Sequence, residues 1–263
     1  MTGLRRCGAW IRARVRAATP QAVRQRLRRM THPPGGVRFG NLRRTRPISR
    51  DFGYERGLPV DRLYIETFLK QHRGDIQGRV LEVGDDGYTV KLGGERVTRR
   101  DVLHVEARPE ATIVDDLASG THIPSDAFDC VILTQTLHLI FDLQAAVRTL
   151  QRIPKPGGVL LATVPGISHI DAGEWNSTWY WSLTPAAMRR LFTDRFPGPL
   201  LQVLAYGNVL TACAFLQGLA TEELSAAELA THDPLYPLVV CVRARKAAAG
   251  DDAQDVRPIA ANA

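Results

Sequence analysis

Cysteine is scarce in this chain of 263 residues, and the four that occur are not arranged for a metal site or a disulfide framework. They are Cys7, Cys130, Cys213 and Cys241, which stand far apart and include no C-x-x-C pair. Three of them lie in apolar segments, where a thiol is normally buried. Buried thiols that form no disulfide are typical of a protein in a reducing compartment. We therefore expect no disulfide, no metal site and a cytoplasmic location.

Long hydrophobic runs are also missing. No apolar run reaches the roughly 18 to 20 residues that a membrane-spanning helix needs. The first thirty residues lack the apolar core of a secretory signal. The sequence therefore predicts neither a transmembrane helix nor secretion. The chain of 263 residues is long enough to bury a sizeable core, and its hydrophobic fraction of 44% is typical of a globular protein.

Acidic residues are absent from the start of the chain. Residues 1–50 contain 14 arginines and no lysine, aspartate or glutamate, whereas the rest has 20 basic and 27 acidic residues. Val23, Leu27 and Met30 give a possible short helix only a thin apolar stripe. We interpret residues 1–49 as a basic, partly disordered extension that can contact anionic lipid or an acidic partner. We expect no specific contact with nucleic acid.

What the remaining sequence does contain is an alternation of short apolar runs with helix signals, over residues 50–246. Helix N-caps are predicted at Asp61, Asp142 and Thr184. The expected strands are 79–83, 97–105, 111–114, 128–134, 159–164, 200–206 and 238–243. Strands that alternate with helices predict a parallel α/β sandwich. Residues 247–263, rich in alanine and aspartate, are expected to be a disordered tail.

The stretch 79–87, RVLEVGDDG, joins an apolar strand to a glycine turn. Gly84 and Gly87 let the backbone turn tightly and approach a ligand. In open α/β sheets, ligands bind at the carboxyl ends of the strands, beside such a turn. Asp85 and Asp86 would set two negative charges against a pyrophosphate, which disfavours NAD, FAD or ATP as the ligand.

Three stretches carry a family resemblance: LEVG at 81–84, FDCVILTQTLH at 128–138 and KPGGVLLATVP at 155–165. They resemble the class I, Rossmann-like S-adenosylmethionine-dependent methyltransferases, and most of all the small-molecule branch called type 11. The resemblance implies an α/β fold with a Rossmann-like, seven-stranded, mostly parallel sheet flanked by helices. It also implies S-adenosylmethionine as the cofactor and a small-molecule or sugar-containing acceptor.

The resemblance assigns cofactor contacts to acids at the strand ends. In this family the acid of the first strand orders the glycine loop, an acid after the second strand binds the ribose, and an acid after the third contacts the adenine. These roles fall on Glu82, Asp101 and Asp116. The alternatives are that Glu82 merely caps loop amides and that Asp116 is a turn residue. The other expected cofactor-binding residues are Gly84, Asp86, Gly87, Leu117 and Gln135.

The glycine loop departs from the family pattern E-x-G-x-G-x-G, because Asp86 and Tyr88 stand where the second and third glycines are usual. Carboxylates attract the sulfonium and ammonium of S-adenosylmethionine, so the loop remains compatible with that cofactor. The departure also leaves an alternative of a different class. In it the chain is a non-catalytic, methyltransferase-like binding or scaffold protein with a degenerate cofactor loop.

Candidate acceptor-side residues follow the fourth and fifth strands. His138 and His169 are the candidate general bases. The expected acceptor-binding residues are Asp171, Trp175, Trp179 and Tyr180, which stand in the polar and aromatic segment 167–181. The alternatives are a structural histidine at 138 and aromatic side chains that pack in the core.

Overall fold

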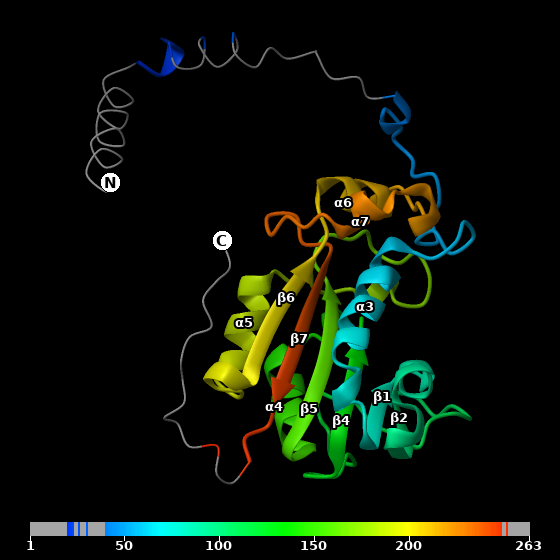
Figure 1. Cartoon of the computed structure of the whole chain (residues 1–263), viewed down its shortest axis with the longest axis vertical. Coiled ribbons are helices and arrows are strands. Elements are labelled where there is room, and N and C mark those ends of the chain that lie inside the picture. Colours follow the sequence, from blue (N-terminus) through cyan, green and yellow to red (C-terminus); the bar gives the residue numbers. More distant parts are fainter. Residues whose placement is uncertain (1–19, 24–25, 27–29, 31–39, 249–250, 252–263) are drawn as a thin grey trace. The chain divides into compact units, whose positions relative to one another are not determined.

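Seven strands form a single sheet in the described part of the chain, in the order β3-β2-β1-β4-β5-β7-β6 (Figure 1). The strands are β1 Gly78–Val83, β2 Val97–His104, β3 Ile113–Val114, β4 Phe128–Thr134, β5 Pro154–Pro165, β6 Leu201–Tyr206 and β7 Val239–Arg245. Strands β1 to β5 pair in parallel, and β7 runs antiparallel to both β5 and β6. The prediction of a seven-stranded, mostly parallel sheet is confirmed.

This computed structural model describes residues 20–23, 26, 30, 40–248 and 251. The chain divides into two compact units, Met1–Thr45 and Arg46–Ala263. In the first unit, residues 21–23, 26 and 30 are helical, Gly40–Leu42 form the short helix η1, and Val23 and Met30 are exposed. Most of the predicted basic extension, and residues 249–250 and 252–263 of the predicted tail, lie outside the described residues.

Helices cover both faces of the sheet. They are α3 Val60–Gln71, α4 Leu143–Arg152, α5 Pro185–Thr193, α6 Val209–Leu216 and α7 Ala226–Ala230. Strand β4 shows the alternation: Val131 and Leu133 pack with α4 and α5, whereas Cys130 and Ile132 pack with α3 and α6. The resulting three layers bury a core on each side of the sheet. None of the helices in the described ranges is long and apolar enough to cross a membrane.

Helix starts follow the capping signals, with one exception. Asp142 accepts a hydrogen bond from the Ala145 amide (2.9 Å), and Thr184 accepts one from the Ala187 amide (3.1 Å). Asp61 was predicted as the N-cap, but the N-cap of α3 is Pro59, two residues earlier, and the helix begins at Val60. Pro59 is held in a β-bridge to Ala220, which sets where the helix can start.

A segment that we call the strap, residues 46–59, leads into α3 and is tied to residues 217–223. The Ile48 and Ser49 amides donate to the Gln217 carbonyl (2.9 and 3.0 Å). Nearer α3, Arg56 forms an ion pair with Glu223 and the Leu58 amide donates to Glu222. The second unit therefore starts at Arg46, four residues before the boundary predicted from composition.

Candidate active site

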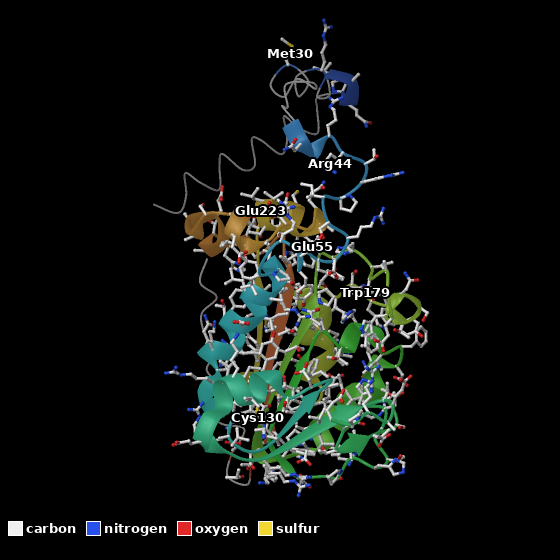
Figure 2. The ribbon with its side chains drawn as sticks, turned by 90° about the vertical axis from the view of Figure 1, so that its right-hand side faces the viewer. Met30, Arg44, Glu55, Cys130, Trp179 and Glu223 are labelled. Atoms are coloured by element: carbon white, nitrogen blue, oxygen red, sulfur yellow. The ribbon has the colours of Figure 1, made fainter. Side chains whose placement is uncertain are left out.

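A cavity of about 950 Å³ opens at the carboxyl ends of the parallel strands. Residues that follow β1, β3 and β4 line it, together with the strap and the segment after β5. Trp179 belongs to that last segment, and Figure 2 shows it well separated from Cys130 near the amino end of β4. The cavity thus lies where an open α/β sheet binds ligands.

The loop after β1 is organised by Glu82. Its carboxylate is buried and accepts hydrogen bonds from the amides of Tyr88 (3.1 Å) and Thr89 (2.8 Å). These bonds start a helical turn, which includes η3 (Thr89–Gly93). Burial raises the pKa of Glu82 to about 7, although the amides act against the rise. Glu82 therefore fixes the loop and does not itself line the main cavity.

Within this loop, Gly84 faces the cavity. Its φ is +96°, and a Cβ atom there would meet open space, so a ligand can approach the backbone. Asp85 also lines the cavity, and its carboxylate accepts from the Gly87 amide (2.8 Å). Gly87 lines a smaller adjoining hollow of about 410 Å³. Asp86 was expected to contact the cofactor, but it pairs with Arg100 (2.7 Å) outside the cavity.

Asp101 is the clearest correction. It was given the ribose-binding role, which in the family belongs to an acid after the second strand, yet it lies inside β2, as in the predicted strand 97–105, opposite Leu81 and three residues before the end of the strand. Its buried carboxylate pairs with Arg79 (2.7 Å) and Arg99 (3.1 Å). Burial alone would raise its pKa, but hydrogen bonds from the two arginines outweigh burial and lower it. Asp101 is thus a paired structural acid that does not line the cavity.

The acid that follows β2 is Glu106. Its amide donates to His104 Nδ1 (3.0 Å), while His104 and Val105 line the cavity. The Glu106 side chain is exposed, and Arg108 lies 3.8 Å from it. The run 102–105, which is apolar except for His104, ends just before this residue, so the sequence did contain a signal that Glu106 is the first acid past the strand.

After β3, Asp116 and Leu117, two of the predicted cofactor-binding residues, both line the cavity. The neighbouring Asp115 is buried and holds the turn, because it accepts from the Asp116 amide (2.8 Å) and the Ser119 hydroxyl (2.9 Å). One Asp116 oxygen accepts from the Ala118 amide (2.8 Å). The exposed side chain leaves its other oxygen open to a ligand.

Beyond β4 the cavity contains two polar side chains with unpaired nitrogens. Gln135 adopts a φ of +47°, a strained value for a residue with a side chain, and its Nε2 is buried without a partner. His138 is 1% exposed, and neither ring nitrogen has a partner. Burial lowers its pKa to about 4, so the imidazole is neutral at pH 7. Buried polar groups normally have hydrogen-bond partners, so these two side chains are candidates to bind a ligand in the cavity.

Aromatic side chains form one wall of the cavity, which we call the aromatic wall: Phe52, Trp175, Trp179 and Tyr180. Trp179 makes an edge contact with His138 (4.3 Å between ring centroids) and a near-parallel contact with Phe52 (6.4 Å). Trp175 and Tyr180 are 37% and 46% exposed, which is not core packing. Asp171 lines the same wall and accepts from the Trp175 amide (3.1 Å).

His169 does not line the cavity, which contradicts its assignment as a candidate base. Its ring stacks on Phe52 at 4.2 Å. Burial lowers its pKa, and the Arg50 backbone and Asp171 act in the opposite direction. The structure therefore places His169 behind the aromatic wall, as a support for Phe52.

A match between the sequence and a family model identifies the family of this chain. A family model described as a methyltransferase domain matches residues 52–196, more than half of the chain. The chain belongs to this methyltransferase family. It is a class I S-adenosylmethionine-dependent methyltransferase, so the predicted enzyme class and cofactor are confirmed.

Solved structures similar to this methyltransferase include two with low identity. A methyltransferase from Archaeoglobus fulgidus is 12% identical, with 70% of this chain and 98% of that chain covered and a TM-score of 0.47. The N-methyltransferase NodS from Bradyrhizobium japonicum, in complex with S-adenosylhomocysteine, is 15% identical, with 76% and 94% covered and a TM-score of 0.46. No curated protein matches the sequence.

The residues of the methyltransferase site that sequence reasoning missed come mainly from the strap and α3. Asp51, Phe52 and Tyr54 reach the cavity from the strap, and Asp61 and Arg62 reach it from the first turn of α3. Their position depends on the contacts between the strap and residues 217–223, which no local pattern reveals. Among the described residues, no group of His, Cys, Asp and Glu could hold a metal ion.

Proposed function

We propose that this enzyme methylates a small-molecule or sugar-containing acceptor bound against the aromatic wall. The observation that carries the proposal is that one cavity contains both the polar strand ends and the aromatic wall. His138, which follows β4 and touches Trp179, joins the two parts. An acceptor on the aromatic wall would then lie beside a cofactor at the strand ends.

The residues at the strand ends fit S-adenosylmethionine, which supplies a methyl group on a positively charged sulfur. We assign the methionine end to the Gly84 backbone, with Asp85 facing the ammonium and Arg62 facing the carboxylate. Glu82 and Gly87 shape this loop. We assign the ribose to Glu106 in place of Asp101, because the exposed Glu106 side chain, which does not itself line the cavity, directly follows Val105, which does. The adenine contacts fall to Asp116, Leu117 and the unpaired amide of Gln135.

At the acceptor end, the chain's main contribution is positioning, because aligned reactants account for much of the rate of an in-line transfer. Trp175, Trp179 and Tyr180 would orient the acceptor and exclude water, with Asp171 at the edge of the same wall. The neutral imidazole of His138 can accept a proton or hydrogen bond from an acceptor O–H or N–H.

Calorimetric titration with S-adenosylmethionine tests the cofactor site directly. Wild-type protein should bind it, and Asp116→Ala should bind it about 2- to 13-fold more weakly, because one hydrogen bond worth roughly 0.5–1.5 kcal/mol is lost. No measurable heat at millimolar cofactor would refute the cofactor assignments. It would also favour the scaffold alternative that the degenerate loop raises.

The assignment of ribose binding to Glu106 predicts different effects for substitutions at Glu106 and at Asp101. Glu106→Gln should weaken cofactor binding, again by about 2- to 13-fold, with an unchanged melting temperature. Asp101→Asn should instead destabilise the protein and leave cofactor binding unchanged. It leaves Arg79 and Arg99 without their carboxylate, which should lower the free energy of unfolding by about 2–3 kcal/mol. Calorimetry and urea unfolding on both variants check this. Unchanged cofactor affinity in Glu106→Gln, together with lost binding in a stable Asp101→Asn, would restore the original assignment of the ribose to Asp101.

We also propose that the basic extension contacts anionic lipid or an acidic partner. The support is that residues 1–49 contain 13 arginines and no acidic residue. Deleting residues 1–45 should leave the melting temperature within about a degree, because the segment has little apolar surface to bury. The deletion should abolish salt-sensitive sedimentation with anionic vesicles, for which neutral vesicles are the control. A melting temperature lowered by several degrees would show instead that the extension packs on the enzyme.

A further inference from the structure

The charge of the cavity wall is almost entirely negative. Among the described residues that line it, Arg62 is the only arginine or lysine. Eight carboxylates line the same cavity: Asp51, Asp61, Asp85, Asp115, Asp116, Asp142, Asp171 and Glu174. A phosphate or carboxylate on the acceptor would meet this excess of like charge, which disfavours an anionic acceptor.

Several of these carboxylates are already committed within the protein. Asp115 accepts hydrogen bonds from its own turn, and Asp142 caps α4. Glu174 forms an ion pair with Arg108 (2.8 Å). Asp61 lies 3.9 Å from Arg62, the arginine that we assign to the cofactor carboxylate. The charges of Glu174 and Asp61 are therefore balanced by arginines, whereas Asp115 and Asp142 hold a turn and a helix start.

Two carboxylates on the acceptor side, Asp51 and Asp171, form no ion pair within the described ranges. Asp171 accepts one backbone amide, that of Trp175. Asp51 immediately precedes Phe52 in the chain, and Asp171 follows His169 by two residues. Both carboxylates line the same cavity as Phe52, and the rings of Phe52 and His169 stack with their centroids 4.2 Å apart. Negative charge beside aromatic faces favours a bound cation.

A second, independent observation points to a ligand at this wall. His138 is buried, lines the cavity, touches Trp179, and has two ring nitrogens without partners. A neutral imidazole does not repel a cation, and it can accept a hydrogen bond from an N–H group. An ammonium group would satisfy both the unpaired imidazole and the unpaired carboxylates.

We propose that the acceptor is a small amine that binds as a cation, with an apolar or aromatic body. Its ammonium group lies against the faces of Phe52 and Trp179, is balanced by Asp51 and Asp171, and donates to His138. This inference rests on the proposed function, because it assigns a substrate class to the same cavity. It concerns recognition, whichever lone pair of the acceptor receives the methyl group.

Three probes of similar shape and different charge test the proposal: 2-phenylethylamine, 2-phenylethanol and 3-phenylpropionate. Each is titrated at neutral pH into protein saturated with S-adenosylhomocysteine, with quenching of tryptophan fluorescence as the readout. The amine should bind at least about tenfold more tightly than the carboxylate, with the alcohol between them. A carboxylate that binds as tightly as the amine would overturn the proposal, as would the absence of binding by all three probes.

Matched variants locate the preference. Asp171→Asn should weaken amine binding about 3- to 10-fold and leave alcohol binding unchanged, because only the charge is removed. Glu174→Gln is the control: its carboxylate lines the cavity but is paired with Arg108, so neither probe should be affected. Equal losses in the two variants would show a diffuse field and no ammonium site. Failure of S-adenosylhomocysteine to bind, measured first, would instead count against the proposed function.

Discussion

Replacing Trp179 by alanine should slow methyl transfer about 100-fold and change cofactor affinity less than about twofold. The ring touches Phe52 and His138 and belongs to the aromatic wall of the cavity, where we place the acceptor. Without it, the acceptor can move relative to the methyl group, and a displacement of about 1 Å can cost 100-fold in rate. The rate is measured as the formation of S-adenosylhomocysteine, and the affinity by calorimetry.

Trp181 provides the matched control, two residues further along the same segment. Its side chain packs on the core formed with α4 and α5, its indole N–H donates to the Ile140 carbonyl (3.0 Å), and it does not line the cavity. Trp181→Ala should lower the free energy of unfolding by about 3 kcal/mol, whereas Trp179→Ala should lower it by less than about 1 kcal/mol. The reverse pattern of stabilities would assign Trp179 to the core and refute its acceptor role.

Much of the fold could be predicted because its signals are local. The apolar run at 128–134 is a strand buried on both faces, and such a run can be read without knowing its neighbours. The caps at Asp142 and Thr184 depend on bonds that span three residues. Glu82 was predicted at the loop after β1 because the strand and the glycine that follows it are both distinct in the sequence.

The site was predicted less completely, because side-chain direction depends on register and on distant contacts. Asp101 and Glu106 stand only five residues apart, and the pairing of β2 with β1 shows that Asp101 stops short of the strand end. Asp86 and Asp85 are adjacent, yet Arg100 draws the first away from the cavity. Phe52 reaches the site because residues far along the chain hold the strap. Apart from the run of residues that ends before Glu106, none of these facts has a local signature.

The pH dependence of stability should depend on two buried groups whose pKa values move in opposite directions. Burial raises the pKa of Glu82 from 4.5 to about 7 and lowers the pKa of His138 from 6.5 to about 4. The Glu82 contribution to stability is present below pH 4.5 and is lost as pH rises towards 7. The His138 contribution is present above pH 6.5 and is lost as pH falls towards 4. Each amounts to about 3 kcal/mol, so the two slopes offset one another between these limits.

Single substitutions should reveal the pH dependence that each group contributes to the free energy of unfolding. In Glu82→Gln only the His138 contribution remains of the two, so the free energy of unfolding relative to wild type should fall by about 3 kcal/mol between pH 7 and pH 4.5. In His138→Gln the relative free energy should fall by a similar amount as pH rises over the same interval. Urea unfolding at a series of pH values measures both, and other acids such as Asp101 cancel in the comparison with wild type. Profiles for either variant that run parallel to wild type would show that its buried group titrates normally. For His138 that result would show an imidazole that is exposed to water. It would count against the proposal that His138 accepts a hydrogen bond from the acceptor.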